Sequence, residues 1–251
     1  MMKHYAFGIL LLSAGLAFAC GSDDGDDGGT GATGGSGGAP ASTVKLGATF
    51  TDFLTKSPVV GLEICTLLPE GRTPNCASTN EDGKIVAEGF PMNFEVLFTA
   101  KKEGVYPLLI SAVSTEEDIT DAGIYTVTTA EVDFLLSNAG LTQEAGKGAV
   151  TFRAGAETEG LADVTVTVSP SGTPVYMDGI KLDPDATKTT SAGVGVILNL
   201  EPETEVTITF EYTGSPARTC TTHMGWTGSA SNVRRVPIKA DILSYLPVEC
   251  L

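Results

Sequence analysis

Short runs in which apolar and polar residues alternate recur along this chain and predict β-strands. The clearest are residues 164–168 and 206–210, in which every second side chain is apolar and most of the others are threonines. A period of two places the apolar side chains on one face of a strand. Between residues 58 and 107, further apolar runs are bounded by turn residues at intervals of about eight to twelve positions, which is typical of antiparallel sandwiches. The pattern therefore predicts an all-β protein.

One segment follows the helical period instead. Thr128 and Glu131 have the spacing of a capping box, and Gly140 stands where a helix stops. The apolar residues between them that share one helix face are Val132, Leu135, Leu136 and Ala139. A helix of two to three turns is not stable alone in water, so its apolar face must pack on one sandwich or between two. We expect it to be a connector.

The second half of the chain echoes the first. Residues 161–164 echo 60–64, residues 190–193 echo 79–83, and residues 200–202 echo 89–91. Each echo is followed by an alternating strand. We infer a diverged second sandwich of the same kind, with residues 174–187 as a longer inserted loop.

The first of these stretches resembles the carboxypeptidase regulatory-like domain, a transthyretin-like sandwich. The residues that carry the resemblance are Pro58, Val59, Gly61, Ile64, Thr79, Asp82, Gly83, Gly89, Pro91, Gly104, Tyr106 and Pro107. The match covers about 60 residues, and Val105 separates Gly104 from Tyr106, which the family usually joins. Asp82–Gly83 is also a dipeptide that permits positive φ in a tight hairpin. The resemblance implies a small sandwich without peptidase ligands.

The first twenty residues have the features of an export signal. Lys3 supplies a positive charge, residues 9–12 form an apolar core too short to span a membrane, and Ala17 and Ala19 satisfy the small-x-small rule of ordinary secretion. Cys20 directly after Ala19 makes the segment resemble a bacterial lipobox. That resemblance implies lipidation of Cys20, and Gly21 in the next position favours the outer membrane.

The segment after Cys20 predicts a disordered tether. Residues 21–38 hold nine glycines in eighteen positions, with two aspartate pairs among them, and cannot bury a core. A free coil over residues 21–41 has a root-mean-square reach of about 25 Å. This length is enough to hold a folded body away from a bilayer.

Charge and cysteine content bear on partners and compartment. The net charge of −16 argues against a nucleic-acid partner, which needs a basic face. Apart from Cys20, the cysteines are Cys65, Cys76, Cys220 and Cys250. Four cysteines allow three pairings, and two separate sandwiches favour Cys65–Cys76 and Cys220–Cys250, in a compartment where such bonds persist. A metal site is disfavoured because neither pair has a CxxC spacing.

The candidates for catalysis are few. His223 is the one histidine that remains after the export signal, and it could act as a general base with Ser229 or Ser231 as nucleophile. No Gly-x-Ser-x-Gly motif accompanies them, and the alternative is a loop held by Cys220 in which Trp226 caps a core. The transthyretin-like enzyme 5-hydroxyisourate hydrolase uses several histidines and a C-terminal Tyr-Arg-Gly-Ser, which this chain lacks. We predict no catalytic residues and no cofactor.

Other polar clusters have ordinary interpretations. Asp178, Asp183 and Asp185 could bind calcium, yet aspartates beside Gly and Pro are common turn residues. Arg234 and Arg235 favour an exposed strand edge guarded against aggregation. Isopeptide cross-linking, which some adhesin sandwiches use, would need Lys45 or another lysine in a core.

These patterns predict two tandem transthyretin- or immunoglobulin-like antiparallel β-sandwiches with one short connecting helix. The expected organisation is a lipoprotein signal peptide (1–19), the lipidated Cys20 with its tether (20–41), the first sandwich (42–118), a linker with the helix (119–147) and the second sandwich (148–251). The expected function is a non-catalytic binding, scaffolding or accessory module of the cell envelope. Its expected partners are the membrane, through the lipid anchor, and a protein or glycan ligand. The alternatives are a small hydrolase or enzyme subunit using His223, and a carbohydrate- or calcium-dependent adhesin.

Overall fold

The computed structural model describes residues 43–67, 75–155, 159–221, 226, 228 and 230–251, and these fold almost entirely as β-strands. The strands before the helix are β1 (Thr43–Asp52), β2 (Glu63–Leu67), β3 (Cys76–Ser78), β4 (Lys84–Pro91), β5 (Glu95–Lys102), β6 (Val105–Val113) and β7 (Ile119–Thr126). After helix α1 (Thr129–Asn138) follow β8 (Gly148–Ala154), β9 (Val164–Ser169), β10 (Pro174–Asp178), β11 (Lys181–Asp183), β12 (Val194–Leu200), β13 (Glu205–Tyr212), β14 (Cys220–Thr221), β15 (Val233–Pro237) and β16 (Leu243–Cys250). The prediction of an all-β sandwich protein with one short helix is confirmed.

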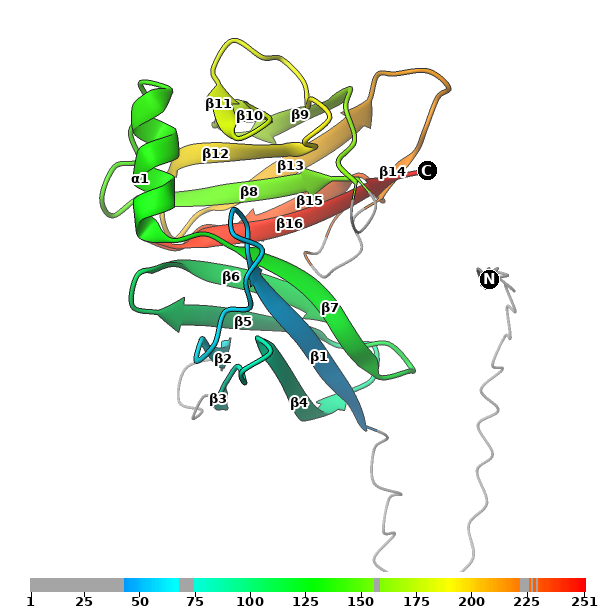
Figure 1. The fold of residues 1–251 in the computed structure, drawn as a ribbon. Coiled ribbons are helices and arrows are strands. Elements are labelled where there is room, and N and C mark those ends of the chain that lie inside the picture. Colours follow the sequence, from blue (N-terminus) through cyan, green and yellow to red (C-terminus); the bar gives the residue numbers. More distant parts are fainter. Residues whose placement is uncertain (1–42, 68–74, 156–158, 222–225, 227, 229) are drawn as a thin grey trace, which may run out of the picture. The chain divides into compact units, whose positions relative to one another are not determined.

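Each half of the described chain is a sandwich of two sheets. In the first, the sheet β4-β1-β7 packs on strands β6-β5-β2-β3. In the second, the sheet β15-β13-β9 packs on strands β12-β8-β16, which the hairpin β10–β11 extends. The halves are joined edge to edge because β6 and β16 pair in parallel at Leu108–Leu243 and Leu109–Ser244. One sheet therefore runs through both sandwiches in the order β11-β10-β12-β8-β16-β6-β5-β2-β3 (Figure 1).

The two cores lie on opposite faces of this shared sheet. Leu243 and Tyr245 of the second half contribute to the first core, whereas Leu109 of the first half contributes to the second. Successive residues of a strand point to opposite faces, so neighbouring positions on β6 and β16 serve different cores. One face of the shared sheet therefore faces the first core in the first half and points away from the second core in the second half.

A buried threonine organises the first sandwich. The Thr79 hydroxyl accepts a hydrogen bond from the Leu62 amide at 2.9 Å and donates one to the Val59 carbonyl at 2.6 Å. The turn that follows ends at Gly83, whose φ is +73° and whose carbonyl accepts from the Phe50 amide. A Cβ on Gly83 would lie 2.5 Å from the Phe50 carbonyl oxygen, so only glycine fits there.

The second sandwich repeats this frame. The Thr189 hydroxyl accepts from the Val164 amide at 2.9 Å and donates to the Leu161 carbonyl at 2.7 Å. Gly193 has φ +67°, and its carbonyl accepts from the Ala154 amide. The threonine that repeats the hydrogen bonds of Thr79 is Thr189 and not Thr190, where the sequence pattern placed the echo.

The strand pairings match as closely as the hydrogen bonds. Strands β1, β4 and β7 pair as β8, β12 and β16 do, antiparallel to the first neighbour and parallel to the second. The pair Thr49–Lys84 of the first sandwich corresponds to the pair Arg153–Val194 of the second. In the same way, the pair Ile64–Ala100 corresponds to the pair Val166–Phe210. The sequence pattern predicted antiparallel pairing only. The structure also contains three parallel pairs, which are β1–β7, β8–β16 and β6–β16.

Two segments differ from the sequence expectations. The range 119–147, expected to be a linker, begins with strand β7, which pairs with β1, so the first sandwich continues past residue 118 to Thr126. The range 174–187, expected to be an inserted loop, contains the hairpin β10–β11, in which Tyr176 pairs with Asp183. The prediction of an irregular loop there is wrong because the apolar residues of β10 extend the shared sheet.

Candidate binding pocket under helix α1

Helix α1 covers part of the shared sheet's second half on the face opposite that sandwich's own core. Its start is fixed by the predicted capping box, in which the Glu131 amide donates to the Thr128 hydroxyl and the Thr128 amide donates to the Glu131 carboxylate. Leu135 and Leu136 are buried, and Gly140 follows the helix with φ +67°. The expectation that the helix packs its apolar side on the sandwiches is confirmed.

A cavity of about 100 Å³ lies between the helix and the sheet. Its walls come from α1, from strands β6, β7, β8, β12 and β16, and from the β10–β11 hairpin. The side chains that form the apolar walls include Leu108, Val132, Leu135, Leu136, Met177, Leu182, Val194, Val196, Leu198 and Leu243. An apolar cavity with a few polar groups directed into it is the usual form of a small-molecule site.

Tyrosine hydroxyls supply polar groups to this cavity. Tyr106, Tyr125 and Tyr245 all line it. Burial raises the pKa of Tyr245, a shift that the nearby Arg153 opposes and Tyr125 reinforces. Burial also raises the pKa of Tyr106, with smaller contributions from Asp241 and Asp133. The Tyr106 and Tyr245 hydroxyls are therefore neutral and can donate hydrogen bonds at ordinary pH.

Two cations and two aromatic rings meet at one end of the cavity. The Lys56 ammonium lies 4.6 Å from the ring centroids of both Phe53 and Tyr125. The Arg153 guanidinium lies 5.8 Å from the Tyr125 ring, and the rings of Phe53 and Tyr125 meet edge to face at 5.9 Å. These contacts are cation–π interactions. Arg153 is the charged side chain among the described residues that line the cavity, whereas Asp133 and Asp241 lie near Tyr106.

A second cavity, of about 120 Å³, lies inside the first sandwich. Its lining is rich in small residues, which include Gly47, Ala48, Ala87, Ala112 and Ala122. These residues leave space between the two sheets, and none of the described residues that line it has a polar side chain. It is a packing feature of the first core.

Trp226 joins the two sandwiches. Its side chain is 1% exposed and belongs to the second core, and its ring N–H donates to the Tyr245 carbonyl at 3.0 Å. Its backbone amide donates to the Glu95 carboxylate at 2.6 Å and to the Ser111 hydroxyl at 2.9 Å, both in the first half. The prediction that Trp226 caps a sandwich core is confirmed, and its contacts also link the halves.

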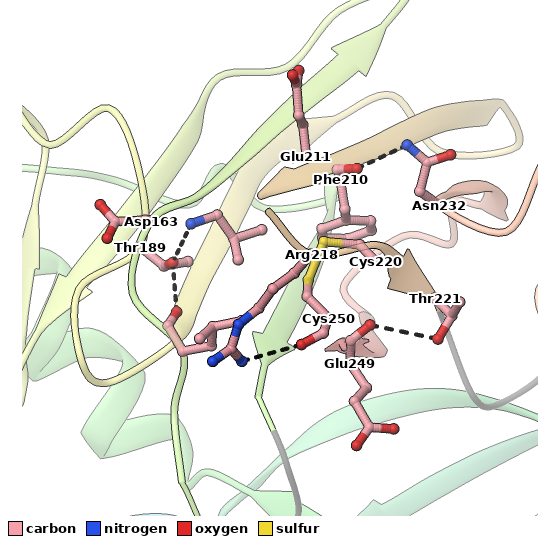
Figure 2. Close-up of a disulfide and its surroundings, with 12 residues drawn as sticks. Asp163, Thr189, Phe210, Glu211, Arg218, Cys220, Thr221, Asn232, Glu249 and Cys250 are labelled. Atoms are coloured by element: carbon pink, nitrogen blue, oxygen red, sulfur yellow. Dashed lines mark hydrogen bonds between the residues drawn. A yellow bond between two sulfur atoms is a disulfide. The ribbon is translucent and has the colours of Figure 1, made fainter. Parts of the chain in front are cut away.

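Both predicted disulfides are present. Cys65–Cys76 links the paired strands β2 and β3, and Cys220–Cys250 links β14 to β16 within the second core. Around the second disulfide, the Arg218 guanidinium donates to the Cys250 carbonyl at 3.3 Å (Figure 2). These four cysteines therefore hold strands together.

Several other candidate residues can be placed. Ser231 is exposed in a turn, whereas Cys20, His223 and Ser229 lie outside the described residues, so the pairing of His223 with a serine stays an untested hypothesis. Arg235 belongs to β15, an edge strand of its sheet, as predicted, and pairs with Glu205 at 3.7 Å.

The surface lysine and the aspartates have ordinary surroundings. Lys45 is half-exposed and pairs with Glu88 at 2.7 Å, so it does not lie in a core as an isopeptide donor would. Asp178 and Asp183 end the strands of the β10–β11 hairpin, and the Asp183 carboxylate accepts from the Asp185 amide. Within the described ranges, no three His, Cys, Asp or Glu residues gather as metal ligands, and no helix is long and apolar enough to cross a membrane.

Sequence reasoning did not identify the cavity, although a signal for it exists. Strand β12 reads Val-Gly-Val-Ile-Leu-Asn-Leu, which is apolar on both faces, and β16 is similar. A strand without alternation is typical of a sheet that is covered on both sides. The covering elements are α1 and the ends of β1 and β7, which lie far away in sequence.

Comparison with known proteins gives only remote structural likeness. No family model and no curated protein matches the sequence. Among solved structures, the minor pilin GBS52 of Streptococcus agalactiae is 15% identical, with a TM-score of 0.27, over 82% of this chain and 95% of that one. The shaft pilin SpaA of Lactobacillus rhamnosus GG is 14% identical, with a TM-score of 0.25, over 84% of this chain and 98% of that one. The Bacillus anthracis TIE protein is 12% identical, with a TM-score of 0.27, over 84% of this chain and 34% of that one. At these values the likeness is too remote to assign a function.

Proposed function

We propose that this chain is a non-catalytic module of the bacterial cell envelope, anchored by a lipid on Cys20 and presenting two joined sandwiches as one body to a protein or glycan ligand. The lipobox-like residues before Cys20 and the glycine-rich tether support the anchor, and Gly21 favours the outer membrane over the inner. The likeness of residues 58–107 to the carboxypeptidase regulatory-like domain supports a transthyretin-like ancestry of both sandwiches.

The shared sheet is the observation that carries the scaffolding role. Separating the two halves would break the β6–β16 pairing and expose Trp226 and Leu109, which are both fully buried. Burial of a large apolar side chain is worth about 1.5–3 kcal/mol, so these contacts oppose hinge motion between the sandwiches. A body without a hinge suits a module that holds a ligand at a set distance from a membrane.

Calorimetry tests the scaffolding part of this proposal. If the sandwiches form one cooperative unit, the chain unfolds in a single transition whose calorimetric and van't Hoff enthalpies agree. Two separated transitions would show that the two sandwiches unfold independently, and the scaffolding proposal would fail.

Mass spectrometry and cell fractionation test the anchor. An acylated N-terminal cysteine and recovery in the outer-membrane fraction are expected for the natural chain, and Cys20→Ser is expected to move the protein to the soluble periplasmic fraction. An unmodified mature N-terminus that begins at Cys20 would contradict the proposed lipid.

A further inference from the structure

We propose that the cavity under helix α1 binds a small carboxylic acid with an apolar tail, such as a short fatty acid or an arylalkanoic acid. The tail would lie between Leu136 of the helix and Val196 of β12, and the carboxylate would lie at the Arg153 end. This inference does not depend on the lipid anchor or on the scaffolding role.

The walls and the size of the cavity define the tail. Its walls are overwhelmingly apolar, and none of the described residues that line it is acidic. A buried cavity of about 150 Å³ lined by aliphatic and aromatic side chains accommodates benzene. A volume of about 100 Å³ with an open side therefore suits a chain of a few carbons or one ring whose polar end reaches solvent.

The polar groups of the cavity indicate which chemical group the polar end of the ligand carries. Tyr245 is 7% exposed and lines the cavity. A tyrosine hydroxyl can donate a hydrogen bond to a carboxylate oxygen. Arg153 and Tyr125 line the same cavity as Tyr245, and Arg153 is the charged side chain among the described residues that line it.

Charge selects an anion at this end. Arg153 and Lys56 are both held over the Tyr125 ring, in a chain whose net charge is −16. A guanidinium has five donors, so Arg153 can hold a carboxylate in addition to its existing contacts. Asp133 and Asp241 lie toward Tyr106 at the other side, which would repel a carboxylate placed in the reverse orientation.

Calorimetric titration with hexanoate and 3-phenylpropionate tests the proposal, with hexanamide as the neutral probe. The protein is the exported full chain carrying Cys20→Ser, so that no acyl group of its own competes. We expect hexanoate to bind about tenfold more tightly than hexanamide, because a hydrogen bond to a charged group is worth about that factor or more. Equal binding of the two, or binding of neither, would overturn the proposal.

Two variants and two matched controls locate the site. Arg153→Met keeps the apolar stem and is expected to abolish the preference for hexanoate over hexanamide, and Leu136→Trp is expected to fill the cavity and abolish binding of both. Arg218→Met removes another arginine that lies over a tyrosine ring, and Ala122→Leu fills the cavity of the first sandwich. Both controls are expected to bind hexanoate as the parent does.

The outcomes separate cleanly. If Arg153→Met keeps its full preference for hexanoate, or if Arg218→Met loses it, the assigned head site is wrong. Circular dichroism confirms that each variant is folded. If Leu136→Trp does not fold, chemical-shift changes of the α1 and β12 amides on addition of hexanoate locate the ligand, and changes confined to other elements would overturn the proposal.

Discussion

The two sandwiches share the same pattern of hydrogen bonds but differ in the sizes of the side chains at equivalent core positions. Thr79 and Thr189 make equivalent bonds, and the strand pairings correspond one to one. By this correspondence, Ala48 opposite Ile85 in the first sandwich occupies the place of Phe152 opposite Gly195 in the second. The first core keeps a cavity beside Ala48, whereas the Phe152 ring fills its place so closely that a Cβ on Gly195 would lie 2.2 Å from it.

At a second pair of equivalent positions, the large and the small side chain exchange places between the two sandwiches. Phe50 and Ala100 of the first sandwich correspond to Ala154 and Phe210 of the second. In each sandwich one position of the pair is large and the other small. The comparison shows that backbone hydrogen bonds define the sandwich, and that large and small side chains can exchange places within it when total volume is roughly kept.

The strongest test of the comparison exchanges the Phe152–Gly195 pair for the residues of the first sandwich. Phe152→Ala is expected to lower the free energy of unfolding by about 3–5 kcal/mol through a cavity. Gly195→Ile is expected to cost about 3 kcal/mol or more, because its side chain meets the Phe152 ring. The double variant is expected to lose at least about 1 kcal/mol less than the two losses added together, measured by urea denaturation. Simple additivity would show that the two positions are not coupled as the register implies.

The disulfides provide the next test. Replacing Cys220 and Cys250 together with alanine is expected to cost about 4 kcal/mol, and replacing Cys65 and Cys76 about 3 kcal/mol, because the Cys65–Cys76 loop is shorter. The sequence separations are 30 and 11 residues. The comparison uses midpoints of urea denaturation under non-reducing conditions, and a larger loss for the shorter loop would contradict this order.

Because Thr79 and Thr189 make equivalent hydrogen bonds, replacing either is expected to lower the free energy of unfolding by a similar amount. Thr79→Val and Thr189→Val each remove a hydroxyl with two hydrogen bonds and leave a buried amide without its partner. Each is expected to cost about 1–3 kcal/mol, with the two losses within about 1 kcal/mol of each other. Thr167→Val, in an exposed position of β9, is the control and is expected to change stability by less than about 0.5 kcal/mol. A large loss at one threonine alone would break the equivalence.

The smallest expected effect concerns the cavity of the first sandwich. Ala48→Val adds two methyl groups beside that cavity and is expected to be neutral or to stabilise by about 0.5–1 kcal/mol. Ala154→Val adds the same groups to the filled second core and is expected to cost about 1–3 kcal/mol. Thermal unfolding of the two variants gives the comparison, and an equal loss in both would show that the first core has no usable space.

Local patterns predicted the parts of the fold that neighbouring residues decide. The alternation from Val164 to Val168 corresponds to β9, and the Thr128–Glu131 box begins the helix where expected. The disulfide pairs followed from the assumption that each sandwich keeps its own cysteines. The hairpin β10–β11 was missed because Gly and Pro around it are typical of loops, and tertiary contacts outweighed that signal.

The sequence by itself determined the strand-rich class, the capped helix, the repeat and the disulfide pairs, because each depends on residue period, turn chemistry or a count within a short span. Only the tertiary structure decided that β6 and β16 pair, that the cores lie on opposite faces, and that α1 closes a cavity over β8 and β12. Those features require residues as distant as Tyr106 and Tyr245 to meet. Sequence period specifies which face of a strand is apolar, and packing between elements specifies what covers it.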